Sequence, residues 1–248
     1  MALPKIELPT HEFEIPSSGK KIRFRPFLVK EQKILLMALE AGKENDIMNA
    51  IKQIITNCVT EKDFDVNEMS SFDMEYFFIH LRARSIGEKV QLNFKCKNVI
   101  DDKECGNNMQ MEHDILSATI EKPANHNKTV FFSNDVGVSM KYPSMKMAEN
   151  LILKTKAKSK NFSETEMALD MIVDCVDYFF KGEEIYYVNE MSREEIKEYI
   201  ENIPKSSLDQ IEIFFQTMPS VKSVVEHKCE KCGFDHKIPL EGMINFFG

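Results

Sequence analysis

The segment Cys229-Glu230-Lys231-Cys232-Gly233 is the stretch around which the chain is organised. A gap of two residues lets both sulfurs of a cysteine pair face one ion, which is the spacing of zinc knuckles. The strand-like run Val221 to Glu226 leads into the pair, and Phe234 to Ile238 returns from it. The segment therefore predicts a strand, a cysteine-bearing turn and a second strand.

A second cysteine pair lies far upstream, between the strand patterns Lys89 to Lys95 and Met109 to Ile115. Its gap of eight residues is wide for a knuckle, but a hairpin-like loop could close it. A glycine follows the second cysteine of each pair, where a tight turn favours a permissive backbone. Because four thiolates complete a closed structural Zn²⁺ site, we expect a zinc-ribbon-like centre. Its predicted ligands are Cys96, Cys105, Cys229 and Cys232.

Alternatives to this centre stay open at the level of the sequence. In one alternative the four cysteines are reduced and free of metal. In the other, one of the flanking histidines, His227 or His236, replaces a cysteine ligand. A catalytic or redox role would need an open metal position and a nearby general base. Lysines and carboxylates alternate around both pairs, so the predicted metal is structural.

The composition is that of an ordinary soluble globular protein. The 248 residues are 43% hydrophobic and 29% charged, and the formal net charge is −8. This acidic balance weighs against sequence-independent binding to nucleic acid. No apolar run has the length of a membrane span, and residues 1–7 lack the pattern of a signal peptide. We therefore expect a cytoplasmic protein, in which spaced cysteines indicate metal before disulfide.

The order of features repeats along the chain. Pro26 and Pro143 are separated by 117 positions, as are Cys58 and Cys175. The pentapeptide Val-Asn-Glu-Met-Ser occurs at 66–70 and again at 188–192. These matches predict an α+β fold of two duplicated subdomains, each with a β-hairpin, helices and a strand–cysteine pair–strand element. The predicted division is residues 1–120 for the first repeat, 121–128 for the linker and 129–248 for the second repeat.

Periodicity predicts the individual elements. Hairpins are expected at 12–27 and 130–142, and helices at 30–41, 46–59, 70–84, 145–156, 163–180, 193–203 and from Ser207. The core candidates of the first helix are Ile34, Leu35, Met37 and Leu39. Ser192 is expected as a helix cap and Cys58 as a small core residue. Arg82 and Arg84 are expected at a solvated helix end, and a similar end explains the lysines of 154–160.

No catalytic motif is present. The sequence has no phosphate-binding glycine loop, no nucleophile elbow and no HExxH pattern. We therefore predict that the protein is not an enzyme, with no catalytic and no cofactor-binding residue. His80 is isolated on its predicted helix and is expected to be a packed or surface histidine.

Several strings resemble one known family. They are Ile22-Arg23-Phe24-Arg25-Pro26-Phe27, Phe72 to Phe78, Leu81 to Glu88 and Lys141-Tyr142-Pro143. They resemble the T-even-type phage baseplate protein family. The resemblance implies a baseplate hub subunit or a chaperone-like hub assembly factor, and it does not separate the two. It also implies binding to other baseplate hub or tail proteins, in the host cytoplasm during phage assembly or in the tail baseplate of the virion.

Terminal apolar residues are the candidate contacts for such partners. The candidates are Leu3, Ile6 and Leu8 at the N-terminus, and Met243, Ile244, Phe246 and Phe247 in the tail. The alternative for the tail is that it folds back on its own domain. The rival function is a zinc-ribbon nucleic-acid-binding or transcription-associated regulator. The sequence does not indicate an oligomeric state.

Overall fold

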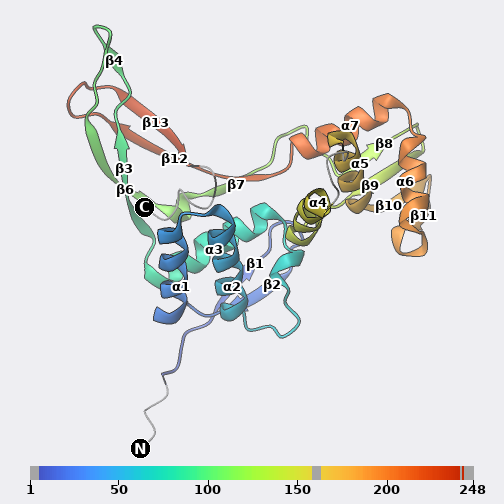
Figure 1. Ribbon diagram of the computed structural model, residues 1–248, viewed down its shortest axis with the longest axis horizontal. Coiled ribbons are helices and arrows are strands. Elements are labelled where there is room, and N and C mark those ends of the chain that lie inside the picture. The colour runs from blue at the N-terminus through green and yellow to red at the C-terminus, as the bar shows by residue number, and fades with distance from the viewer. Residues whose placement is uncertain (1–5, 158–162, 241, 243–248) are drawn as a thin grey trace, which may run out of the picture. The chain divides into compact units, whose positions relative to one another are not determined.

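The computed structural model describes residues 6–157, 163–240 and 242, and it shows a mixed α+β chain (Figure 1). The chain divides into two compact units. Unit 1 comprises Met1–Val66, Phe72–Glu121 and Ser220–Gly248, and unit 2 comprises Asn67–Ser71 and Lys122–Pro219. Leu3 and the candidate contacts of the tail lie outside the described residues, whereas Ile6 is 84% exposed.

The body of unit 1 is a hairpin packed on three helices. Strands β1 (His11–Glu14) and β2 (Lys21–Phe24) pair antiparallel, and α1 (Val29–Ala41), α2 (Glu44–Cys58) and α3 (Ser71–Ile86) follow. Aromatic rings join the hairpin to α3, since Phe77 lies 4.9 Å from Phe13 and 5.2 Å from Phe24 between ring centroids. The apolar stripe of α2 is buried as its periodicity predicts, and Cys58 on that stripe is a core residue.

Two predictions for this body are wrong. Met37 is 59% exposed, because α1 buries Glu31, Leu35 and Ala38 instead. Arg82 is 7% exposed, and its Nη1 donates to the carbonyl of Gly87 at 3.2 Å. Burial lowers the pKa of Arg82. The guanidinium thus bonds to the backbone just beyond the end of α3 instead of extending into solvent.

Two long hairpins complete unit 1. One is formed by β3 (Lys89–Lys95) and β6 (Asn108–Asp114), and the other by β12 (Ser220–Lys228) and β13 (Asp235–Leu240). The short strand β7 (Thr119–Glu121) follows β6 and pairs with β12. Alternation places one face of each hairpin inward. The buried residues of these faces are Val90, Leu92, Met109, Met111, Val221, Ser223, Val225 and Leu240.

Unit 2 is a four-stranded antiparallel sheet with helices on one face. The strand order is β11 (Glu184–Tyr187), β10 (Val176–Lys181), β9 (Val136–Met140) and β8 (Thr129–Phe131). Helices α5 (Glu164–Asp174), α6 (Arg193–Glu201) and α7 (Lys205–Gln216) share a core with it, and α4 (Met145–Ala157) packs on α5. Ser192 caps α6 as predicted, accepting from the Glu195 N–H at 3.2 Å.

The predicted helix at 163–180 is wrong in its last third. Helix α5 ends at Asp174, and Val176–Lys181 forms the central strand β10 between β9 and β11. The β-branched and aromatic residues Val-Asp-Tyr-Phe-Phe favour a strand, and pairing on both sides secures it. The helix predicted from Ser207 begins earlier, at Lys205.

The predicted repeats share local features in the structure. Both copies of Val-Asn-Glu form 3-10 turns, at Val66–Glu68 and Val188–Glu190. The carbonyl of Cys58 accepts from Arg25 N–H at 2.9 Å, and that of Cys175 accepts from Lys141 N–H at 2.8 Å. The compact units group the chain differently from the repeats, since β12 and β13 belong to unit 1. The repeat boundaries stay a prediction.

Candidate metal centre

The four predicted cysteine ligands converge in unit 1. Their Sγ atoms all lie within 4.8 Å of one another. Cys96 Sγ is 3.6 Å from Cys232 Sγ, and Cys105 Sγ is 3.9 Å from Cys229 Sγ. These separations far exceed the roughly 2.05 Å of a disulfide, and all four cysteines are free. Four thiols in this arrangement could hold a metal ion.

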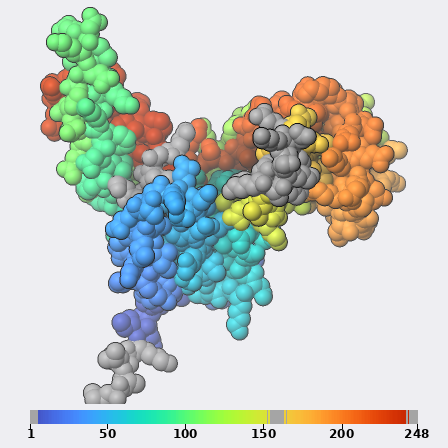
Figure 2. Space-filling view, in the orientation of Figure 1, coloured from blue at the N-terminus to red at the C-terminus, as the bar shows by residue number. Residues whose placement is uncertain are grey.

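Strand pairing brings these sequence-distant cysteines together. The short strand β7 follows the first hairpin and pairs with β12, with Ile120 opposite Val221. A polar contact joins the hairpins further along, where His113 Nε2 lies 2.7 Å from Ser223 Oγ. As a result the cysteine-bearing ends of the β3–β6 and β12–β13 hairpins lie side by side (Figures 1 and 2).

The two cysteine turns have the same backbone hydrogen bonds despite their different spacing. The carbonyl of Cys96 accepts from Gly106 N–H at 3.0 Å, and that of Cys229 accepts from Gly233 N–H at 2.8 Å. The N–H of Cys96 donates to Asn107, the residue after Gly106, at 2.7 Å. The N–H of Cys229 donates likewise to the residue after Gly233, at 2.9 Å. Both glycines have a positive φ, of 65° and 72°, as the predicted tight turns require.

A small inserted hairpin accounts for the wide gap of the first pair. Strands β4 (Val99–Ile100) and β5 (Lys103–Glu104) pair across Asp101 and Asp102. At its base the N–H of Cys105 donates to the carbonyl of Asn98 at 2.7 Å. Without Val99–Glu104 the sequence would read Cys-Lys-Asn-Cys-Gly, which matches Cys-Glu-Lys-Cys-Gly of the second pair. The first turn thus has the backbone hydrogen bonds of the second, with a six-residue hairpin between its two cysteines.

Polar side chains surround the sulfurs. Asn98 Nδ2 lies 3.7 Å from Cys232 Sγ, and Asn107 Nδ2 lies 3.6 Å from Cys229 Sγ. Each amide thus donates from the first hairpin to a sulfur of the second. His236 Nε2 lies 3.2 Å from Cys96 Sγ. Neither asparagine was predicted as part of the site, although each stands within two residues of a predicted ligand, because the partner sulfurs lie on the other hairpin.

The protonation of the cluster is uneven. Burial raises the pKa of Cys96 to about 12. In contrast, hydrogen bonds from the backbone N–H groups of Cys232 and Lys231 lower the pKa of Cys229 to about 6. The lowered pKa favours the thiolate of Cys229, the form that binds metal ions. Cys96, whose pKa is raised, must release a proton when a cation binds.

The surroundings of the cluster are electrically balanced. Lys237 pairs with Glu226 at 2.8 Å, and Lys231 Nζ donates to the carbonyl of Cys105 at 3.1 Å.

The other two cysteines lie outside the cluster, and burial raises the pKa of Cys58 to about 11 and of Cys175 to about 12. Such buried thiols are inert.

The fold and this cluster define an α+β protein with a potential four-thiol metal centre built from two sequence-distant hairpins. None of the helices in the described part of the chain has the length and apolar character to cross a membrane. The chain belongs to the T4 bacteriophage base plate protein family, whose model matches residues 8–248. The predicted family resemblance is thereby confirmed, and a role in the phage baseplate follows from the membership.

One curated relative matches over nearly the whole chain. The baseplate hub assembly protein gp26 of Enterobacteria phage T4 is 26% identical over 238 residues, which are 96% of this chain and 97% of that protein. No solved structure matches the chain.

Proposed function

We propose that the chain is a non-enzymatic baseplate hub protein or hub assembly factor that acts, like a chaperone, through contacts with other baseplate proteins. The observation that carries this proposal is the match to a hub assembly protein along 97% of its length. A match of this extent supports a shared role better than a match to one module would. Assembly would take place in the host cytoplasm, and a hub subunit would remain in the baseplate of the virion.

The second part of the proposal is a structural Zn²⁺ bound by Cys96, Cys105, Cys229 and Cys232. In a tetrahedral site with Zn–S bonds of about 2.3 Å, neighbouring sulfurs lie about 3.8 Å apart. The separations of 3.6 and 3.9 Å bracket this value. Four protein ligands leave no open position for a substrate, which supports a structural role over a catalytic one. The asparagine amides would offset part of the negative charge of the thiolates.

An internal duplication would explain the pairing of the two knuckles. The knuckles share their backbone hydrogen bonds, and both copies of Val-Asn-Glu form 3-10 turns. These likenesses support repeats at 1–120 and 129–248. Each repeat would then contribute one zinc knuckle to the common centre.

Affinity capture during infection tests the functional proposal. A tagged full-length chain, expressed in cells infected by the phage that encodes it, should enrich baseplate hub proteins. Deletion of the gene should yield tails without complete baseplates in electron micrographs. Normal baseplates after deletion would contradict the assembly role. Binding to DNA or RNA that weakens steeply with salt would favour the nucleic-acid regulator instead.

A further inference from the structure

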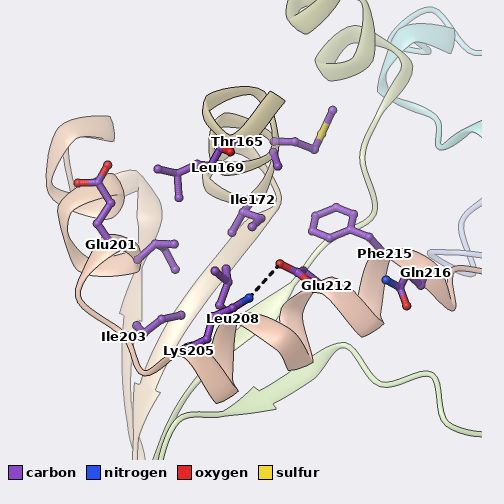
Figure 3. Close-up of a pocket in the computed structure, with 13 residues that line it drawn as sticks. Thr165, Leu169, Ile172, Glu201, Ile203, Lys205, Leu208, Glu212, Phe215 and Gln216 are labelled. Atoms are coloured by element: carbon purple, nitrogen blue, oxygen red, sulfur yellow. Dashed lines mark ion pairs between the residues drawn. The ribbon is translucent and has the colours of Figure 1, made fainter. Parts of the chain in front are cut away.

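Helices α5, α6 and α7 of unit 2 enclose an apolar groove of about 630 Å³ (Figure 3). Ile172 and Ile200 belong to the buried core at its base. Leu169, Leu208 and Phe215 pack partly buried against that core and line the groove. Its surface is therefore built from the same apolar side chains that hold the three helices together.

Acidic residues border this groove. Glu201 and Glu212 line it and are exposed. The one lysine of the lining, Lys205, is paired with Asp209 at 2.6 Å and with Glu212 at 3.6 Å. No ion pair within the described residues engages Glu201. The groove thus has an apolar base and a rim on which the unpaired charge is negative.

The helices around the groove are strongly acidic as a set. Together α5, α6 and α7 contain ten acidic and three basic residues, a formal net charge of −7. This is most of the net charge of −8 of the whole chain. A groove with an apolar base in such a field attracts cations and repels anionic partners.

From this charge and shape we infer that the groove is a docking site for a basic amphipathic helix of a partner protein. An amphipathic helix places apolar side chains at i, i+3, i+4 and i+7 into a hydrophobic groove, and its flanking lysines and arginines would meet the acidic rim. The inference deepens the proposed function and rests on it, since it names the surface and the partner chemistry for the protein contacts.

The direct test is titration of the full-length chain with a synthetic helical peptide, followed by fluorescence anisotropy. The probe has about 20 residues, with leucines at i, i+3, i+4 and i+7 and lysines elsewhere. A peptide with glutamates in place of the lysines and a peptide of scrambled order are the controls. We expect the leucine–lysine helix to bind, the glutamate peptide to fail and the scrambled peptide to bind at least about tenfold more weakly.

Matched variants locate the binding. Glu201→Lys with Glu212→Lys should weaken peptide binding about tenfold or more, because it reverses the charge of the rim. Glu183→Lys with Glu190→Lys changes the net charge equally at exposed positions outside the lining, and should change affinity less than about twofold. Ala168→Arg fills the groove from an exposed position and should also abolish binding. Circular dichroism checks that each variant is folded.

Three results would overturn the inference. The first is that the basic helix does not bind, and the second is that the two charge-reversal variants lose peptide affinity equally. The third is a dimer in solution that Ala168→Arg dissociates, since a second copy of the chain would then fill the groove. Failure of the inference differs from failure of the proposed function. Hub proteins captured equally by wild type and Ala168→Arg would exclude the groove and leave the function standing, whereas peptide binding without any capture of hub proteins would contradict the function.

Discussion

Deleting Val99–Glu104, so that Asn98 joins Cys105, should preserve the metal centre. The deletion removes the inserted hairpin β4–β5 and leaves Cys-Lys-Asn-Cys-Gly, the spacing of the second knuckle. The N–H of Cys105 already donates to the carbonyl of Asn98 at 2.7 Å. The new peptide bond therefore requires the two ends to approach by only about 2 Å.

The expected change in stability is small. The loop between the cysteines falls from eight residues to two, which lowers its closure cost by about 1.2 kcal/mol. Little burial is lost, because Val99 is 60% and Ile100 46% exposed. Strain from joining Asn98 to Cys105 opposes this gain. We therefore expect the free energy of unfolding to change by less than about 1 kcal/mol. That corresponds to a shift in Tm of about 2–4 °C at most.

The assay is metal content together with thermal unfolding in the presence and absence of a chelator. The shortened chain should bind as much zinc as the wild type and should lose stability in chelator to the same extent. The matched control also removes Asn98 and leaves Cys96-Lys97-Cys105. Its one-residue gap is shorter than the two to four residues usual between two cysteine ligands of one zinc ion, so the control should bind metal more weakly than the six-residue deletion. Loss of metal in the six-residue deletion itself would refute the equivalence of the two knuckles.

Three further predictions concern the described core. Glu31 is fully buried and pairs with Arg25 at 3.1 Å. Burial alone would raise the pKa of Glu31, but its hydrogen bonds outweigh that effect and lower the pKa. Glu31→Gln should therefore lower the free energy of unfolding, measured in urea, by about 3 kcal/mol. A Cβ on Gly137 would lie 2.5 Å from Cζ of Phe180, so Gly137→Ala should destabilise unit 2 by about 2 kcal/mol or more. Burial and two nearby lysines lower the pKa of His126 below its ordinary 6.5. The unfolded chain then binds the proton more readily, so stability should fall as pH drops below 6.5, and less steeply in His126→Gln.

Neighbouring substitutions provide the controls. Lys30 also lies near Glu31, at 3.5 Å, but is 68% exposed, so Lys30→Ala should cost less than about 0.5 kcal/mol. Ser139→Ala is the control for Gly137→Ala, because Ser139 lies on the same strand β9. Equal losses of stability in the two variants would show that the close contact at Gly137 is not the cause. An unchanged pH profile in His126→Gln would exclude that histidine as the source of acid sensitivity.

The sequence predicted which four cysteines form the cluster, because cysteine spacing and the following glycines are local signals. Convergence of Cys96 and Cys105 with Cys229 and Cys232 was inferred from the repeats, and the structure brings their sulfurs together through the pairing of β7 with β12. The inserted hairpin was not predicted as such, since its strands have only two residues each and no apolar alternation.

Long-range packing decided the features that the sequence did not reveal. Val176–Lys181 follows a helix without a glycine or proline between them, so no local stop signal marks the end of the helix, and pairing with β9 and β11 secures the strand. Arg82 was expected in solvent from its charge, yet its side chain is buried and donates to the carbonyl of Gly87. The groove between α5, α6 and α7 was also missed, because the residues that line it come from three helices that the sequence does not place together.

The central claim is tested most directly by counting zinc in the purified full-length chain by elemental analysis, together with the reactivity of the cysteines. A shared structural centre predicts about one zinc per chain, with four thiols protected until a strong chelator is added. Two zinc ions per chain, or none with all four thiols reactive in the folded protein, would contradict it.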